Sequence, residues 1–306
     1  MRTISIDQLK RVLADIPENP RVLVSGNFAT PFSLLNEFDR AIPKYTLHML
    51  NAQIGIPNRE GVTYESAFVG PGMRNSSRLN YIPSRLSMLP VIIRDHAIPD
   101  IVLLHTSPRR YDTVSLGTEV NILPAAIETV RDRGGIVIAQ ANKNMPYTYG
   151  DAQVYENEID FLVEIDEPLM EHHPGESNDV ARAIGEKIAE LVKDQSTLQM
   201  GIGAIPDAVL GLLKNRKGLR VWTEMFSDGI LDLEKVGALD SEVPITASFL
   251  FGSKELYYWA NLNRRIQMLR TEKTNDPSNI AKQARDRKST RLNSSHVSES
   301  RMPSSA

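Results

Sequence analysis

The sequence predicts an open α/β fold with a mostly parallel sheet, and three observations support this prediction. Short apolar runs rich in β-branched residues alternate with longer segments of helical periodicity, which is typical of parallel strands covered by helices. Two of these runs, at residues 197–200 and 219–223, end abruptly in residues suited to a sharp turn or a ligand. The length of 306 residues exceeds that of a usual single domain, so we expect two domains, each with its own core.

The first half of the chain supplies the alternating pattern in order. A buried-type strand at residues 21–25 is broken by Gly26, and Pro31 marks the start of a helix that ends before Pro43. Further strands are predicted at residues 45–50, 101–104, 136–139 and 161–165, and further helices at residues 83–95 and 123–133. Apolar, β-branched strands connected by helices favour parallel pairing.

A polar, turn-rich segment at residues 171–178 precedes a helix in which Val180, Ile184, Ile188 and Leu191 recur at helical spacing. We place the domain boundary in this segment. The predicted domains are therefore residues 1–173 and 174–285.

The last 21 residues differ in composition from the rest. Residues 286–306 contain seven serines, no aromatic residue and no apolar periodicity, which predicts a disordered tail. The segment also resembles the conceptual translation of a sequencing-library adapter. We therefore exclude it from the fold and expect the natural reading frame to continue differently after Arg285.

Composition and charge exclude several classes of protein. A net charge of -3 and a pI near 6.1 argue against bulk attraction to nucleic acid or to anionic lipid. The chain has no cysteine, which excludes disulfides, zinc-thiolate sites and a thiol nucleophile. It shows neither a signal peptide nor an apolar run of the ~20 residues that a membrane helix needs, so we expect a cytoplasmic protein.

A glycine-containing turn follows the predicted strand at residues 197–200. Gly201 and Gly203 leave backbone amides open to a ligand, and Pro206 begins a helix whose amino end favours negative charge. Such a turn can hold a phosphate or an oxyanion, although a turn that needs glycine only for steric reasons has the same pattern. It lacks the third glycine of the dinucleotide fingerprint and the Lys-Ser/Thr of a nucleoside-triphosphate loop, so we reject those two ligands.

Glu224 follows the neighbouring predicted strand. Because carboxyl ends of parallel strands meet at one edge of the sheet, its carboxylate is expected to lie near the glycine turn. A carboxylate beside an oxyanion-stabilising turn can attack an activated acyl group and form a covalent intermediate. The alternative is a strand-end glutamate that is paired with an arginine or solvated.

Several of these segments together resemble the acetyl-CoA hydrolase/transferase family, and most closely its 4-hydroxybutyrate and butyrate CoA-transferases. The resemblance rests on residues 198–210, on the Thr-Glu-Met-Phe-Ser-Asp-Gly run at 223–229 and on the Thr-Asn-Asp-Pro run at 274–277. Earlier segments agree, among them residues 106–108, 115–117 and 145–151, so that the similarity spans residues 10 to 285.

The resemblance implies two tandem, open, mostly parallel CoA-transferase domains of the NagB/RpiA-like type, of which the second is incomplete here. It implies that Glu224 is the nucleophile of a ping-pong reaction through a glutamyl-CoA thioester, with coenzyme A as substrate and without bound cofactor or metal. Backbone amides at Gly201, Gly203, Ala204 and Ile205 would form the oxyanion and CoA site, and Gln140 and Asn142 would contact the carboxylate substrate. The expected partners are acyl-CoA and short-chain carboxylates, with neither nucleic acid nor membrane, and a homo-oligomer is expected for the whole protein.

The sequence also departs from the family. Trp222 stands where many relatives carry histidine, and residues 108–112 replace a more acidic turn, so the acyl specificity cannot be transferred. Relatives continue after the Asn-Asp-Pro run into a Gly-Gly-containing loop, and we therefore expect the 306-residue chain to be inactive. Hydrolysis of acetyl-CoA and a non-catalytic sensor of a sugar phosphate or CoA derivative remain alternative functions.

The remaining candidate residues are less informative. His172 and His173 are expected to be a surface pair rather than a metal site, and His105 a core or rim histidine. Arg264 and Arg265 are expected to form a solvated face, with contact to CoA phosphates as the alternative.

Overall fold

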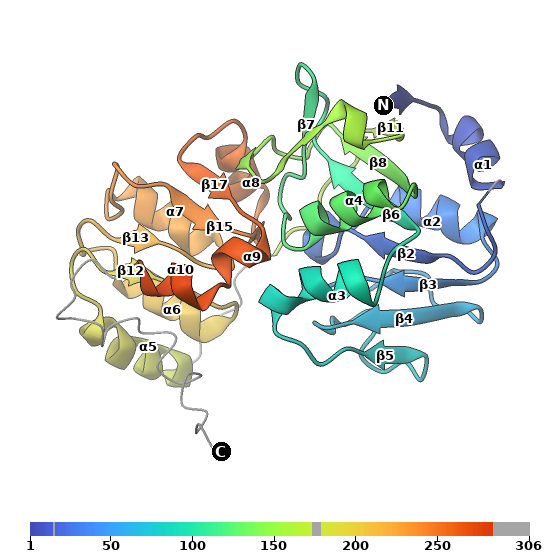
Figure 1. Ribbon diagram of the computed structural model, residues 1–306. Coiled ribbons are helices and arrows are strands. Elements are labelled where there is room, and N and C mark those ends of the chain that lie inside the picture. The colour runs from blue at the N-terminus through green and yellow to red at the C-terminus, as the bar shows by residue number, and fades with distance from the viewer. Residues whose placement is uncertain (15, 173–178, 284–306) are drawn as a thin grey trace. The chain divides into compact units, whose positions relative to one another are not determined.

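The computed structural model of the chain describes residues 1–14, 16–172 and 179–283. It divides into two compact units, one from Met1 to Met170 and one that begins at Glu171, and each has an α/β architecture (Figure 1). The boundary predicted between residues 173 and 174 and the predicted tail at 286–306 lie outside the described residues.

The first unit contains four α-helices in its described residues: α1 (Ile6–Ala14), α2 (Phe32–Ala41), α3 (Leu89–Asp95) and α4 (Leu123–Asp132). Its strands are β1 (Arg2–Thr3), β2 (Arg21–Val24), β3 (Tyr45–His48), β4 (Val62–Ser66), β5 (Leu79–Tyr81), β6 (Ile101–Thr106), β7 (Thr113–Ser115), β8 (Ile136–Asn142), β9 (Tyr149–Gly150), β10 (Gln153–Tyr155) and β11 (Phe161–Ile165).

Eight of these strands form one sheet in the order β1-β11-β8-β6-β2-β3-β4-β5. All of its neighbouring strands run parallel, as the sequence predicts. In the centre, Leu23 pairs with His48 of β3 on one side and with Val102 of β6 on the other. Strands β7 and β10 form a separate antiparallel ribbon.

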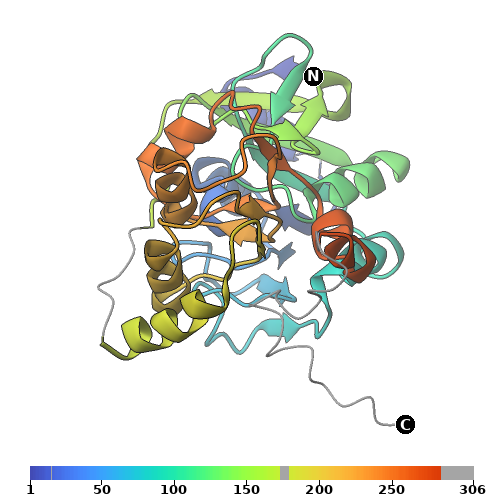
Figure 2. The same cartoon turned by 90° about the vertical axis from the view of Figure 1, so that its left-hand side faces the viewer.

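Helices cover both faces of this sheet (Figures 1 and 2). Alternate residues of each strand point to opposite faces, so Val22 and Val24 of β2 join one hydrophobic cluster while Leu23 does not. That cluster includes Leu34 and Phe38 of α2, both almost completely buried. The contact between α3 and α4 belongs to the other helix layer.

The structure corrects one predicted helix in this unit. Residues 83–95 do not form one helix, because α3 begins only at Leu89, after a short 3₁₀ turn at Leu86–Met88. Pro90 sits in the first turn of α3, the place where a missing N–H and a fixed φ are tolerated. In a helix starting near residue 83, the same proline would lie in the interior and break a hydrogen bond.

The described part of the second unit contains six α-helices: α5 (Asp179–Leu191), α6 (Ala204–Leu212), α7 (Asp228–Lys235), α8 (Lys254–Ala260), α9 (Thr271–Thr274) and α10 (Pro277–Ala281). Its strands are β12 (Thr197–Leu198), β13 (Arg220–Val221), β14 (Met225–Phe226), β15 (Ile245–Ala247), β16 (Phe249–Leu250) and β17 (Ile266–Met268).

These short strands form one succession of parallel neighbours. Strand β12 pairs with β13, a bridge between Trp222 and Thr246 joins β13 to β15, and β15 pairs with β17. Strands β14 and β16 continue the two middle strands and pair with each other. Helices α5 to α8 contact one another in chain order and form one layer.

The segment after β17 returns across the strands to β12. Leu269 O accepts from the Ser248 hydroxyl, Thr274 O from the Trp222 indole N–H, and Gln283 O from the Thr197 hydroxyl. Helices α9 and α10 lie in this segment, so they bring residue 275 back to the strand ends where Glu224 lies.

Candidate active site

The turn between β12 and α6 has the backbone geometry that only glycine adopts readily. Gly203 has φ 122° and ψ 178°, the mirror image of an extended residue. A Cβ added at Gly201 or Gly203 would meet nothing within 4 Å. The requirement at Gly203 therefore comes from its dihedral angles, and crowding explains neither glycine.

Helix α6 presents its amino end at this turn. Asp207 N–H donates to Gly203 O at 3.2 Å, the first backbone hydrogen bond of the helix, and Pro206 has no N–H. Helix geometry leaves the N–H groups of Ala204 and Ile205 without intrahelical acceptors, and both residues are exposed. Two adjacent donors at a helix amino end suit a negatively charged oxygen.

Glu224 lies between β13 and β14 and is half-buried. Its backbone carbonyl accepts from Ser248 N–H at 2.7 Å and from Phe249 N–H at 3.0 Å, which fixes the main chain against the neighbouring strand. Its carboxylate oxygen Oε2 accepts from the Asn275 side-chain amide at 2.7 Å. The side chain is therefore held at the strand end where the sequence predicts it.

Two neighbouring residues determine the orientation of the Asn275 side-chain amide. Its Oδ1 accepts from the Thr274 hydroxyl at 2.7 Å, while its NH₂ group donates to Glu224. The reverse orientation would place an amide oxygen against a carboxylate, so the hydrogen-bond network assigns this one. The Thr274 hydroxyl is itself 2.7 Å from the hydroxyl of Ser248, which is buried on the strand next to Glu224.

Thr223 joins the glycine turn to the segment of Glu224. It is fully buried, and its Oγ1 accepts from Met200 N–H at 3.0 Å. The same oxygen lies 3.1 Å from Met200 O and 2.9 Å from Met225 O. Because Met200 precedes the turn and Thr223 precedes Glu224, this hydroxyl keeps the two predicted motifs side by side.

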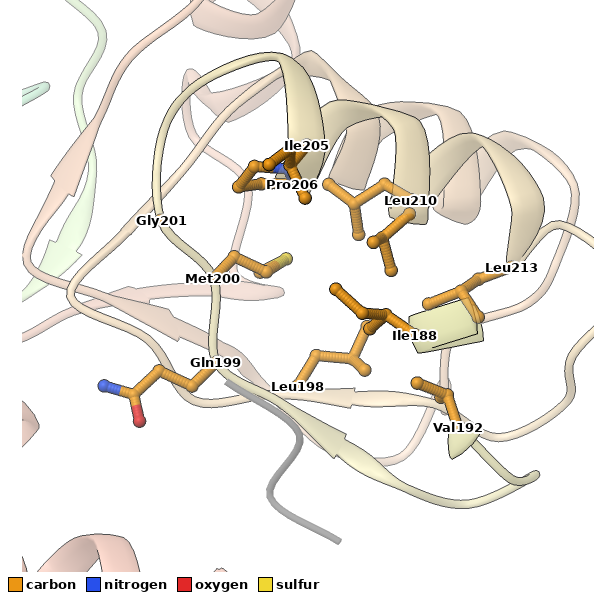
Figure 3. Close-up of a pocket in the computed structure, with 11 residues that line it drawn as sticks. Ile188, Val192, Leu198, Gln199, Met200, Gly201, Ile205, Pro206, Leu210 and Leu213 are labelled. Atoms are coloured by element: carbon orange, nitrogen blue, oxygen red, sulfur yellow. The ribbon is translucent and has the colours of Figure 1, made fainter. Parts of the chain in front are cut away.

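A partly enclosed apolar cavity of about 100 Å³ lies next to the turn (Figure 3). Its walls come from α5 and the residue that follows it, from β12 with the first residues of the turn, and from α6. The lining residues are Ile188, Val192, Leu198, Gln199, Met200, Gly201, Ile205, Pro206, Val209, Leu210 and Leu213. Two of the predicted site residues, Gly201 and Ile205, therefore border the cavity.

The structure places Gln140 and Asn142 in the first unit, at the carboxyl end of β8, where both are almost completely buried. Gln140 Oε1 accepts from Leu34 N–H at 2.8 Å, and Asn142 Nδ2 donates to Glu167 O at 2.9 Å. Both amides also lie within 3.4 Å of His105 Nε2. These contacts connect loops of the first unit, and a role in binding a carboxylate stays a prediction for both residues.

The carboxyl edge of the first sheet also holds a buried carboxyl group that the sequence did not single out. Glu119 Oε1 accepts from Gly26 N–H at 3.1 Å, and Oε2 has no hydrogen-bond partner among the described residues. Burial raises the pKa of Glu119 to about 7, and burial lowers that of the nearby His105 to about 4. Asn27 and Asn121, whose backbones have positive φ, lie in the same group.

The sequence prediction missed Thr223 and Asn275 as parts of the site. Asn275 lies 51 positions from Glu224, and only its place in the Thr-Asn-Asp-Pro run marked the segment as important. Thr223 carried no signal of its own, because a threonine at a strand end is common.

The remaining candidate residues, the histidine pair and the arginine pair, make common structural contacts where they are described. The His172 ring packs 4.8 Å from the Phe251 ring, and His173 lies outside the described residues. Arg265 forms an ion pair with Glu234 at 3.1 Å.

In residues 1–14, 16–172 and 179–283, no three His, Cys, Asp or Glu side chains are arranged to hold a metal ion. Within the same residues, no helix combines the length and apolar character needed to cross a membrane.

The chain is similar to several CoA-transferases, although no protein-family model matches it. It is 34% identical to the 4-hydroxybutyrate coenzyme A transferase of Clostridium kluyveri over 292 residues, which cover 89% of this chain and 67% of that protein. It is 31% identical to the succinyl-CoA:acetate/propanoyl-CoA:succinate CoA transferase of Fasciola hepatica, covering 87% of this chain and 59% of the relative.

A solved structure agrees with these relatives. The 4-hydroxybutyrate CoA-transferase of Porphyromonas gingivalis superimposes with a TM-score of 0.76 at 28% identity, covering 92% of this chain and 70% of that protein. The chain thus spans about 60 to 70% of the length of these three proteins.

Proposed function

The chain belongs to the family of CoA-transferases, and on that premise we propose that Glu224 is the nucleophile that moves CoA between a short-chain acyl-CoA and a free carboxylate. The observation that carries the proposal is the position of this carboxylate. Asn275 donates a hydrogen bond to this carboxylate at the strand end. The hydroxyl of the preceding residue, Thr223, binds Met200 at the start of the turn that carries the two open amides.

The reaction begins when a Glu224 oxygen attacks the thioester carbonyl carbon. The carbonyl oxygen becomes an oxyanion, and collapse of this intermediate breaks the C–S bond, giving a mixed anhydride and CoA thiolate. The thiolate then attacks the Glu224 carbonyl of the anhydride and expels the first carboxylate, which leaves a glutamyl-CoA thioester. An acceptor carboxylate repeats these steps in reverse. Each step exchanges one activated acyl group for another, so the cycle needs neither ATP nor a net proton transfer.

The chain's own groups have separate roles in this scheme. The Ala204 and Ile205 N–H groups, with the Gly203 backbone, stabilise the oxyanion of the tetrahedral states, as a pair of fixed dipoles does in other acyl transfers. Asn275 holds Glu224 in one rotamer and keeps the attacking oxygen in place. Coenzyme A is a substrate here, and the proposal includes no bound cofactor.

The test is the variant Glu224→Gln in the natural full-length protein, which we expect to act as a cytoplasmic homo-oligomer. We expect the exchange of label between acetate and an acyl-CoA to fall by a factor of ~10⁴ or more, because removing a nucleophile removes the covalent route. In the unmodified protein, incubation with acyl-CoA should add the mass of CoA less one water to the Glu224 peptide.

The exposed Glu242 supplies a matched control. Glu242→Gln should leave exchange unchanged. Normal exchange by Glu224→Gln would show that the nucleophile is assigned wrongly. CoA binding without exchange in the unmodified full-length protein would favour a sensor. Release of free CoA without an acceptor carboxylate would identify a hydrolase.

A further inference from the structure

The turn between β12 and α6 carries the two open amides of the proposed site but has little support of its own. Residues 201–205 are exposed, and a Cβ added at Gly201 or Gly203 would meet nothing within 4 Å. The turn is therefore held from its two ends, which are Met200 on the strand side and helix α6 on the other side (Figure 3). The position of the amides relative to Glu224 depends on how each end is attached to the segment that contains Glu224.

One hydroxyl on each side of Glu224 attaches one end of the turn. The Thr223 hydroxyl binds the strand end, as described above. The Ser227 hydroxyl, three residues after Glu224, donates to Oδ1 of Asp207 at 3.1 Å. Asp207 lies in the first turn of α6, and its backbone N–H makes the first hydrogen bond of that helix with Gly203 O. A hydrogen bond from the Glu224 segment thus reaches the helical turn that carries the open amides.

The Ser227 hydroxyl makes this contact instead of the one that its position favours. Ser227 is the N-cap residue of α7, where a serine hydroxyl ordinarily accepts from a backbone N–H of its own helix, but no such bond is present. The residue is buried, and its hydroxyl donates to the side chain on α6. This arrangement favours a role in joining α7 to α6 over a role in stabilising α7 itself.

Packing alone does not define how the amino end of α6 is oriented. Helices α6 and α7 approach closely at Gly229, where an added Cβ would lie 2.6 Å from Leu210 Cδ1. Apolar contact of this kind is non-directional, so it holds the helices together without fixing the direction in which the amides point. A hydrogen bond has a preferred distance and angle, so the bond between Ser227 and Asp207 can fix that direction.

We propose that Asp207 is a positioning residue for CoA transfer, which through Ser227 fixes the α6 amides where they can stabilise the oxyanion formed at Glu224. The inference rests on the proposed function, because it needs Glu224 as the nucleophile and these amides as donors. In this scheme Asp207 contacts neither the acyl group nor the reacting atoms. Because the oxyanion exists only in and near the transition state, displaced amides should lower kcat and leave the KM for acyl-CoA nearly unchanged.

The test compares Asp207→Ala, Ser227→Ala and Asp207→Asn in the natural full-length protein. Each alanine variant removes the hydrogen bond, so we expect kcat for CoA exchange to fall by about 30-fold, since a misplacement of about 1 Å can cost roughly 10²-fold. Asp207→Asn keeps an acceptor oxygen for the Ser227 hydroxyl and should stay within about threefold of the unmodified protein. The double alanine variant should be no slower than either single variant, because both changes remove the same bond.

Asp232 supplies a matched control on the same pair of helices. It lies on α7 and forms an ion pair at 3.0 Å with Lys214, which follows the carboxyl end of α6. Asp232→Ala therefore also removes an aspartate contact between these segments, but at the end of α6 opposite the turn, and should leave kcat unchanged. An equal loss of kcat in Asp207→Ala and Asp232→Ala, in proportion to the loss of Tm in each, would show a general structural role and overturn the proposal.

Mass spectrometry of the Glu224 peptide separates this inference from the proposed function. The glutamyl-CoA thioester should form about 30-fold more slowly in Asp207→Ala than in the unmodified protein. If it forms at the normal rate, or if Asp207→Asn is as slow as Asp207→Ala, Asp207 does not position the amides although Glu224 remains the nucleophile. If the unmodified protein forms no thioester on Glu224, the proposed function is wrong and this inference is overturned with it.

Discussion

The two units share a succession of helix, strand and helix but bury it differently. In the first unit, α1, β2 and α2 follow one another, and β2 lies between β3 and β6. In the second, α5, β12 and α6 follow one another, but in the part of the chain that the structure describes β12 pairs with β13 alone. A central strand in one unit thus corresponds to an edge strand in the other.

The helices before these strands differ in the same way. Leu9 and Leu13 of α1 are almost completely buried, whereas Val180 and Leu191 of α5 are 68% and 56% exposed. The apolar spacing that predicted α5 therefore did identify a helix, but among the described residues Val180 and Leu191 on that face remain mostly exposed. The buried side of α5 consists of small residues, and Gly185 approaches Ala208 of α6 closely. Similar local sequence patterns produce either a closed core or a partly open cavity, depending on the strands beside them.

A pair of buried leucines, one on α2 and one on α6, tests this difference in packing and should show the largest effect. Leu34 of α2 is 1% exposed within a dense cluster, while Leu210 of α6 is 2% exposed but borders the cavity. Leu34→Ala should lower the free energy of unfolding of the first unit by about 4–5 kcal/mol. Leu210→Ala should cost the second unit only about 2–3 kcal/mol, because fewer atoms contact that side chain.

Denaturant unfolding of each variant, with hydrogen exchange to assign the transition to a unit, measures both values. Equal losses at the two positions would mean that the cavity is filled in solution and that the contrast in packing is wrong.

The carboxyl groups at the two sheet edges form a second contrast. Glu224 is half-buried and bonded to an amide, whereas Glu119 is 1% exposed and burial raises its pKa from 4.5 to about 7. The folded protein therefore binds the Glu119 proton more tightly than the unfolded chain. The stability that this protonated carboxyl group contributes is fully present below about pH 4.5 and is lost as the pH rises to 7. Across this pH range the free energy of unfolding should fall by about 3 kcal/mol.

The measurement is the free energy of unfolding from pH 4.5 to 8 for the unmodified protein and for Glu119→Gln. The difference between the two curves isolates Glu119, because His105 contributes to both. A difference that does not change with pH would mean that Glu119 is already ionised in the folded protein.

The smallest effect concerns the glycines that follow β2 and β12. Gly26 has ordinary dihedral angles, but a Cβ there would lie 2.0 Å from Leu50 O; Gly203 has open space but a positive φ. Gly203→Ala should therefore cost about 1–3 kcal/mol through backbone strain. Gly201→Ala in the same turn should change stability by less than about 0.5 kcal/mol. Thermal unfolding compares the pair, and equal tolerance of both substitutions would mean that the turn relaxes easily.

The central strands of the first unit and the position of Glu224 at a strand end could be predicted from the sequence alone. The apolar, β-branched runs at the central strands β6 and β8 are buried on both faces, so they carry a strong local signal. Strand β5 was missed because it is a short edge strand with exposed residues. The Asn275 contact could not be predicted, since it depends on how the segment after β17 returns across the sheet, and no local pattern encodes that path.

The backbone of Gly203 also makes the turn sensitive to chirality. Its φ of 122° and ψ of 178° are the angles that an extended residue of opposite handedness adopts without strain. A D-alanine introduced there by chemical ligation should therefore retain the turn that L-alanine distorts, and it should restrict the unfolded chain more than glycine does. At this one position, a mirror-image residue fits the native backbone better than any of the nineteen genetically encoded chiral residues.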